Sequence, residues 1–322
     1  MDNGVKQGGV LSPILFCVYL DELLKRLERT GVGCFIGHHF FGSVGYADDV
    51  KLLSPSITGL QTLVNTCEQF SQEYDVTFNT KKTLCICYGT EDVAGMRMVT
   101  LNGAFIPWQT EVKHLGNFLR YDLTDKADVR KKKGDFVAAV NKLNSVFSTV
   151  QAEIKLSLLQ TYCTSWFGCQ AWQLGTPFAN EMNIQWQKAV RRTAGLPRQT
   201  RSVLLPGLSG NANFHVQHER RFARLYSTML TSSNPSISFL ATRASTNSVG
   251  VIGRNRVFLA LKYGTVNGRF LVTPRSDSSP DVAPRVEQLR ELLRARDGLV
   301  TIGNLEPDDI SIAIEFLATY RT

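Results

Sequence analysis

The stretch "GYADDV", residues 45–50, places two adjacent aspartates, Asp48 and Asp49, between apolar, strand-forming segments. The flanking runs "HFFGSVGY" and "VKLLS" are rich in Phe, Val, Tyr and Leu, as β-strands are. They predict a hairpin that carries both carboxylates at its tip. Aspartate is common in solvated turns for local hydrogen-bonding reasons. Neighbouring carboxylates also hold divalent metal ions against substrate phosphates, so these six residues alone leave both interpretations open.

The overall composition is that of an ordinary globular protein with a basic second half. The chain has 322 residues, enough for a substantial core and about two domains, with 43% apolar and 20% charged residues. Its net charge is +8. The segment from Glu181 to Ala260 contains eleven Lys and Arg residues but only two acidic residues. This imbalance favours a polyanionic partner such as nucleic acid.

Cysteine usage and hydropathy predict an intracellular chain without a membrane span. The seven cysteines are scattered and include no C-x-x-C pair, which indicates neither a zinc site nor a disulfide framework. "MDNGVKQGG" lacks the features of a signal peptide, and the longest apolar run, "ILFCVYL", is too short to cross a bilayer. We therefore expect the nucleus or the cytoplasm.

Hydrophobic periodicity divides the chain into a mixed first part and a helical second part. Ser12 and Pro13 predict the N-cap and first position of a helix to about Arg29, and Ser54 or Ser56 caps a second helix. Strands are expected around these helices up to about Tyr121. Later helices are expected over 136–150, 154–172, 182–190, 213–232, 284–297 and 307–319, with a loop-like segment over 233–283.

Four short signals occur in a fixed order: "QGGVLSP" (7–13), "YADD" (46–49), "NTKKT" (79–83) and "HLG" (114–116). Their order and spacing over residues 4–120 resemble the palm of the reverse transcriptases of non-LTR (LINE-type) retrotransposons. The later segment "WQKAVRRTAGLPRQTRSVLLPGL" (186–208) resembles the basic, tryptophan-bearing helix that follows the thumb in such elements.

The resemblance implies an α+β fold and a nucleotidyl transfer reaction. Residues 1–125 would form a partial polymerase palm, an antiparallel sheet with packed helices. Residues 126–205 would form an all-α thumb-like region, and 206–322 a basic, helical and partly loop-like C-terminal extension. The implied function is part of an RNA-directed DNA polymerase, with template RNA, a DNA primer and dNTPs as partners. The oligomeric state is not indicated.

The resemblance also assigns roles to individual residues. Asp48 would be the principal and Asp49 the accessory ligand of two Mg²⁺ ions, for which Mn²⁺ can substitute. Roles near primer or nucleotide are implied for Tyr46, Gln7, Gly8, Lys82, Leu115 and Gly116. Structural alternatives stay open for these residues: a cross-strand packing tyrosine, a helix-entry turn, a solvated turn lysine and a plain edge strand.

Basic residues of the second half are candidates for phosphate contacts. The expected residues are Lys131, Lys132, Lys188, Arg191, Arg192 and Arg198. For the "RKKK" run at 130–133, a solvated charge cluster is the alternative. Trp186 falls on the apolar stripe of Met182 and Val190, which favours core packing over base stacking.

The resemblance is incomplete at one catalytic position. Members of the family carry a third carboxylate on a strand before the "QG" segment, whereas only Asp2 precedes Gln7 here. We therefore expect a C-terminal piece of a longer enzyme, begun at an internal methionine, with negligible polymerase activity alone. A non-enzymatic nucleic-acid-binding remnant and a protein-interaction module are the alternatives.

Overall fold

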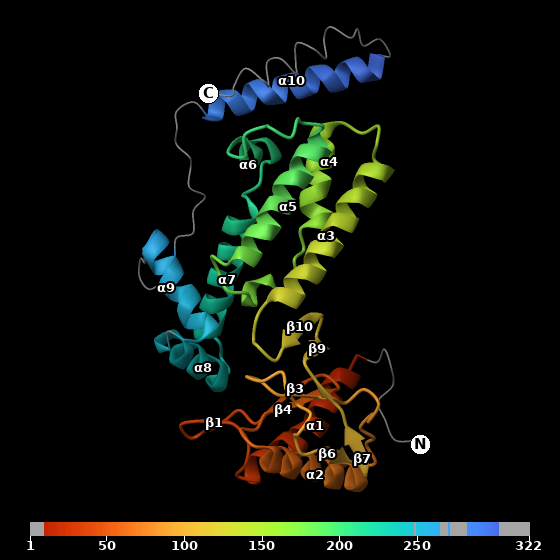
Figure 1. Cartoon of the computed structure of the whole chain (residues 1–322), viewed down its shortest axis with the longest axis vertical. Coiled ribbons are helices and arrows are strands. Elements are labelled where there is room, and N and C mark those ends of the chain that lie inside the picture. Colours follow the sequence, from red (N-terminus) through yellow and green to blue (C-terminus); the bar gives the residue numbers. More distant parts are fainter. Residues whose placement is uncertain (1–9, 248, 265–269, 271–281, 303–322) are drawn as a thin grey trace. The chain divides into compact units, whose positions relative to one another are not determined.

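The computed structural model describes residues 10–247, 249–264, 270 and 282–302. It divides into two compact units, drawn in Figure 1. The first comprises residues 1–112 and 119–124, and the second comprises 113–118 and 125–322. The mixture of helices and small sheets confirms the expected α+β class. No helix in the described ranges is long and apolar enough to cross a membrane.

The first unit combines two long helices with short paired strands. Its elements are α1 (Ser12–Arg29), β1 (Phe35–Ile36), β2 (His39–Phe40), β3 (Ser43–Tyr46), β4 (Asp49–Leu52), α2 (Ile57–Tyr74), β5 (Cys85–Ile86), β6 (Val99–Leu101), β7 (Ala104–Ile106) and β8 (Trp108–Gln109). Strands β9 (Glu111–His114) and β10 (Asn117–Arg120) pair with each other, and each contains residues assigned to both units.

The strands of the described chain form separate two-stranded sheets. The pairs β1–β2, β3–β4 and β6–β7 are antiparallel, whereas β5 and β8 are parallel. The expectation of one antiparallel sheet is therefore corrected in detail. Every described strand is only two to four residues long, so each offers few backbone groups with which to pair further neighbours.

Helix α2 holds the first unit together because it buries side chains on two sides. Leu63 and Phe70 pack with Leu23 and Leu27 of α1, whereas Val64 packs against β6 and β7. Leu23, Leu27 and Leu63 are fully buried, and burying each such side chain stabilises the fold by about 1.5–3 kcal/mol.

The ends of these helices follow the predicted capping only in part. Ser56 caps α2, accepting a hydrogen bond from the backbone N–H of Gly59 at 3.1 Å. Helix α1 begins at Ser12 itself, with Leu11 in the cap position, so the prediction of Ser12 as N-cap was wrong. Pro13 does lie in the first turn, where its missing N–H has no intrahelical partner to lose.

The second unit is helical. Its elements are α3 (Lys126–Val146), α4 (Ala152–Leu158), the π-helix η1 (Leu159–Cys163), the 3₁₀-helix η2 (Cys169–Ala171), α5 (Pro177–Ala194), α6 (Leu204–Ser209), α7 (Phe214–Leu230), α8 (Pro235–Thr246), α9 (Val251–Tyr263) and α10 (Val282–Ile302). Helices α3, α4 and α5 lie side by side (Figure 1). Trp186, 1% exposed, packs in their common core, which confirms its structural role.

The helix predicted over 154–172 is interrupted. Helix α4 ends at Leu158, and the chain passes through η1 into a non-helical turn before η2. Trp166 and Gly168 have φ angles of 35° and 89°, which no right-handed helix accommodates. The apolar spacing was correct, but the left-handed residues break the helix.

The prediction of a loop over 233–283 was wrong where the structure describes it, because α8 and α9 occupy most of that range. The side chain of Asn234 caps α8 by accepting from the N–H groups of Ser236 and Ile237. Asn255 of α9 is fully buried and joins the carbonyl of Trp172 to the N–H of Leu174, each at 2.8 Å. The helix predicted over 307–319 lies outside the described residues.

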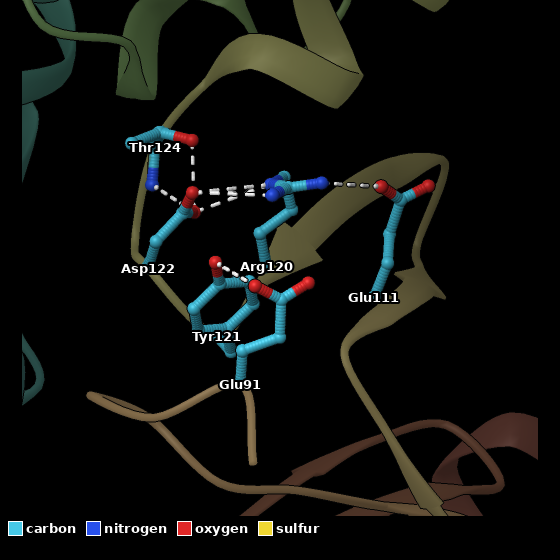
Figure 2. Close-up of polar contacts among 6 residues, drawn as sticks. All are labelled: Glu91, Glu111, Arg120, Tyr121, Asp122 and Thr124. Atoms are coloured by element: carbon cyan, nitrogen blue, oxygen red, sulfur yellow. Dashed lines mark hydrogen bonds and ion pairs between the residues drawn. The ribbon is translucent and has the colours of Figure 1, made fainter.

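A polar cluster closes the first unit after β10 (Figure 2). Arg120 donates to Asp122 at 3.2 Å and to Glu111 at 3.4 Å. Asp122 also accepts from the backbone N–H of Thr124 at 3.0 Å. Burial opposes ionisation of Asp122, but hydrogen bonds from Arg120 and Thr124 outweigh it and lower the pKa to about 2.

Replacing Gly168 tests the tight turn in the second unit. A Cβ atom there would lie 1.8 Å from Oδ1 of Asn117, and the residue has positive φ. We expect Gly168→Ala to lower the free energy of unfolding by about 2–4 kcal/mol, since left-handed strain and steric overlap add. Urea titration followed by tryptophan fluorescence measures it. Gly210→Ala is the control, because Gly210 has φ +67° and open space. It should cost about 1–2 kcal/mol, and equal losses would exclude the overlap.

The depressed pKa of Asp122 predicts acid-sensitive stability. The carboxylate stabilises the fold fully above its unfolded pKa of about 3.9, and this contribution is lost as the pH falls toward about 2. We expect Asp122→Asn to lower the free energy of unfolding at pH 7 by up to about 1 kcal/mol, as for a partly exposed pair. The difference from wild type should vanish near pH 2 in urea titrations. A difference independent of pH would show that the charge does not contribute.

Candidate active site

The β3–β4 hairpin carries the two aspartates. Its strands pair from Ser43 opposite Leu52 to Tyr46 opposite Asp49, which leaves Ala47 and Asp48 as a two-residue turn. Ala47 has a φ of 50°, the positive value that the twist of such short hairpins requires. The predicted hairpin is thus confirmed, with one refinement. Asp48 alone lies in the turn, whereas Asp49 is the first residue of β4.

One face of this hairpin is fixed against α1. Gly45 lies so close to the helix that a Cβ atom would be 3.3 Å from Cδ2 of Leu20. Val50, the cross-strand partner of Gly45, joins the apolar cluster that includes α1 and α2. A glycine at this position therefore lets the strand approach α1, and the packing restricts how far the hairpin can move.

The opposite face is open. Tyr46 is 63% exposed and pairs directly with Asp49, so their side chains emerge on the same face. Lys51 lies two residues further along β4 on that face, where burial lowers its pKa and the nearby Asp49 opposes the shift. The exposure of Tyr46 argues against a packing role for its ring.

The two carboxylates are exposed, and Lys51 is the nearby cation that acts on Asp49. Within the described ranges, neither Asp48 nor Asp49 forms a side-chain hydrogen bond or ion pair, and both are exposed. No group of three or more His, Cys, Asp or Glu side chains that could hold a metal ion occurs there. Carboxylate oxygens are the donors that Mg²⁺ prefers, so the pair fits such an ion chemically. It supplies only part of a coordination shell.

Of the other predicted site residues in the first unit, the structure describes some and leaves others out. Gln7 and Gly8 lie outside the described residues. Lys82 lies in an exposed turn, in which Oδ1 of Asn79 accepts from the N–H groups of Lys81 and Lys82 at 3.0 and 3.2 Å. In the described chain no hydrogen bond or ion pair joins Lys82 to either aspartate.

Leu115 and Gly116 form the turn between β9 and β10. Their φ angles are 46° and 78°, and a leucine with positive φ is strained. The carbonyl of Gly116 accepts a hydrogen bond from Nζ of Lys132 at 2.9 Å. The predicted primer-positioning turn and one predicted phosphate-binding lysine thus meet within the second unit.

Several of the predicted basic residues have structural partners. Lys131 pairs with Asp135, and Arg192 donates to Oδ1 of Asn141 at 2.6 Å. Arg191 donates to the carbonyl of Thr200 at 2.8 Å, and burial lowers its pKa. By contrast, Lys188 and Arg198 have no hydrogen bond or ion pair in the part of the chain that the structure describes.

Comparison with known proteins agrees with the first-unit motifs. Residues 1–119 match the reverse transcriptase (RNA-dependent DNA polymerase) family. An 85-residue segment is 40% identical to a Pol polyprotein from the retrotransposable element R2 of Popillia japonica, covering 26% of this chain and 12% of that protein.

Two longer matches extend into the second unit. The RNA-directed DNA polymerase from the mobile element jockey of Drosophila funebris is 26% identical over 164 residues, 49% of this chain and 17% of that protein. Its counterpart from Drosophila melanogaster is 24% identical over 206 residues, 60% of this chain and 22% of that protein. The chain spans less than a quarter of the length of each of these three relatives. The chain is thus similar to the reverse transcriptases of non-LTR retrotransposons, and its first 119 residues carry the family match.

Proposed function

We propose that this chain forms part of an RNA-directed DNA polymerase that extends a primer during retrotransposition. The observation that carries the proposal is the β3–β4 hairpin, on which Asp48 and Asp49 are both exposed while the other face is packed on α1. Two adjacent exposed carboxylates supply oxygen ligands that suit a divalent cation binding between them. Template RNA, a DNA primer and dNTPs are the proposed partners, in the nucleus or the cytoplasm.

Different residues of the first unit would bind the metal ions, the primer and the nucleotide at this site. Asp48 and Asp49 would hold two divalent ions, Mg²⁺ or Mn²⁺. When bound, such ions activate the primer 3′-hydroxyl and neutralise the leaving pyrophosphate. Tyr46 presents its exposed ring on the face of Asp49, where the end of a primer can lie against it. Lys82 would bind the triphosphate, and Gln7 and Gly8 would let template or nucleotide approach the backbone.

The proposal also extends to the remaining regions. Residues 1–125 would serve as part of the palm, 126–205 as a thumb-like region, and 206–322 as a basic extension. The turn of Leu115 and Gly116 would position the primer backbone. Because two carboxylates only partly surround a metal ion, the third would come from residues outside those described, and the chain alone would be almost inactive.

A chimera tests the role of the aspartates. Residues 1–119 would replace the matching segment of an active jockey polymerase, and template-dependent primer extension would be measured with Mg²⁺. We expect an active chimera in which Asp48→Asn or Asp49→Asn lowers the rate more than about 100-fold. Removing a side chain that only orients a metal ligand typically lowers metal affinity or activity 10–100-fold, and removing a ligand itself lowers them further. Asp21→Asn is the control, since Asp21 lies on α1 and pairs with exposed Lys25.

The possible outcomes of the chimera experiment test the catalytic role of the aspartates separately from the need for a third carboxylate. An active chimera indifferent to both substitutions would exclude the aspartates from catalysis. Robust synthesis by the unmodified chain alone, lost on Asp48→Asn, would instead show that the missing carboxylate is not needed.

Salt dependence tests the basic residues of the second unit. We expect primer–template affinity of the full chain to fall with salt, and Lys188→Ala or Arg198→Ala each to reduce the slope of log K against log [salt] by about 1 if it contacts a phosphate. Fluorescence anisotropy at several salt concentrations measures the slope. Arg192→Ala is the matched control, because its guanidinium already binds Asn141. An unchanged slope in both test variants would exclude these two contacts.

A further inference from the structure

A cavity of about 220 Å³ lies within the second unit, between α3 and the segment that connects η1 to η2. Lys132, Phe136, Tyr162, Ser165, Trp166 and Phe167 are among the residues that line it. Pockets for drug-sized ligands typically measure about 300–1,000 Å³. This cavity is smaller, so it suits a single flat ring system.

Two exposed aromatic side chains belong to this cavity. Tyr162 is 72% exposed and Phe167 is 58% exposed. Single exposed aromatics are common on protein surfaces, but here two of them line one hollow. Nζ of Lys132 lies 5.5 Å from the ring centroid of Phe167, which adds a positive charge beside the ring. The site therefore combines flat apolar faces with a cation, and the carboxylate of Asp135, which also lines it, is paired with Lys131.

Arg221 of α7 helps to hold the segment that carries Phe167. Arg221 donates to the carbonyl of Thr164 at 2.8 Å and to the carbonyl of Ser165. Its guanidinium also lies 5.6 Å from the ring centroid of Trp166. These contacts hold Trp166 in a strained conformation with a φ of 35°. Because this backbone segment is already ordered, ligand binding here loses little conformational entropy of the segment.

A buried donor at the same place lacks an acceptor. Trp166 is 2% exposed and lines the cavity, and its indole N–H has no hydrogen-bond partner in the described chain. Buried tryptophan N–H groups are usually paired, although that of Trp186 in the core of this unit also has no partner among the described residues. The π-helix η1, which ends at Cys163, adds a second irregularity of a kind often found at functional sites.

We propose that this cavity stacks one unpaired base of a single-stranded nucleic acid on Phe167 and Tyr162, with Lys132 near its backbone. The choice of nucleic acid rests on the proposed function. The flat aromatic faces, the cation and the single-ring size fit a base that has left the stack, as aromatic platforms for single strands do. Bases within a duplex are already stacked on their neighbours and do not reach such a hollow.

Anisotropy titrations of the full chain with labelled oligonucleotides test this. The probes are single-stranded RNA or DNA of about ten nucleotides, within the usual site sizes, the same strand with abasic positions, and a blunt duplex. We expect Phe167→Ala to weaken single-strand binding about tenfold, the scale of one base–aromatic stack, and Phe167→Tyr to retain it. Abasic strands and the duplex should not distinguish wild type from Phe167→Ala. Phe105→Ala, at a phenylalanine of β7 that is 67% exposed, is the control and should have no effect.

The remaining outcomes overturn the proposal in distinguishable ways. Single-strand affinity of Phe167→Ala within about twofold of wild type, or an equal loss on abasic strands, would exclude base stacking. Duplex binding by wild type with no single-strand binding would refute the cavity proposal and leave the polymerase proposal intact. Binding of none of the probes would count against both.

Discussion

The packing of the β3–β4 hairpin against α1 is the constraint on which the candidate site depends. Gly45 has no side chain, so Leu20 approaches the strand, and Val50 joins the cluster built on Leu23 and Leu27. Each fully buried leucine contributes about 1.5–3 kcal/mol. Two exposed unit charges 4 Å apart repel by about 1 kcal/mol in water and about 4 kcal/mol near a protein surface. Apolar burial on one face is therefore sufficient to hold both carboxylates on the hairpin.

The second unit relies more on buried polar groups. Asp128 is 3% exposed and accepts from the indole N–H of Trp172 at 2.8 Å and from the N–H of Phe118 at 3.1 Å. Asn255 and Arg221 satisfy carbonyls of the irregular segment between η1 and α5 in the same way. Such groups are costly to leave unpaired, so they specify one path for this segment. The same ordering presents Phe167 and Tyr162 at the surface beside the cavity.

The local sequence was sufficient to predict secondary structure wherever one hydrophobic periodicity dominated a segment. The apolar stripes predicted α1, α2 and α5, and the chemistry around "YADD" predicted the β3–β4 hairpin. It failed over α8 and α9, where Ser, Asn, Gly and Thr indicated a loop. Isolated helices this short are marginal, and tertiary contacts such as that of Asn255 stabilise them. The helix over 154–172 failed for the opposite reason, because left-handed residues interrupt a correct apolar spacing.

The sequence by itself determined the residue types of the site, because carboxylates, their order and their flanking strands are local properties of the chain. Tertiary structure alone decided that Asp48 lies in the turn while Asp49 lies in the strand, since pairing register depends on both strands. It also gave Lys131, Arg191 and Arg192 internal partners, whereas Lys188 has none among the described residues, a difference that charge counting does not show. The cavity had no sequence signal, because its walls come from separate segments that meet only when the helices pack.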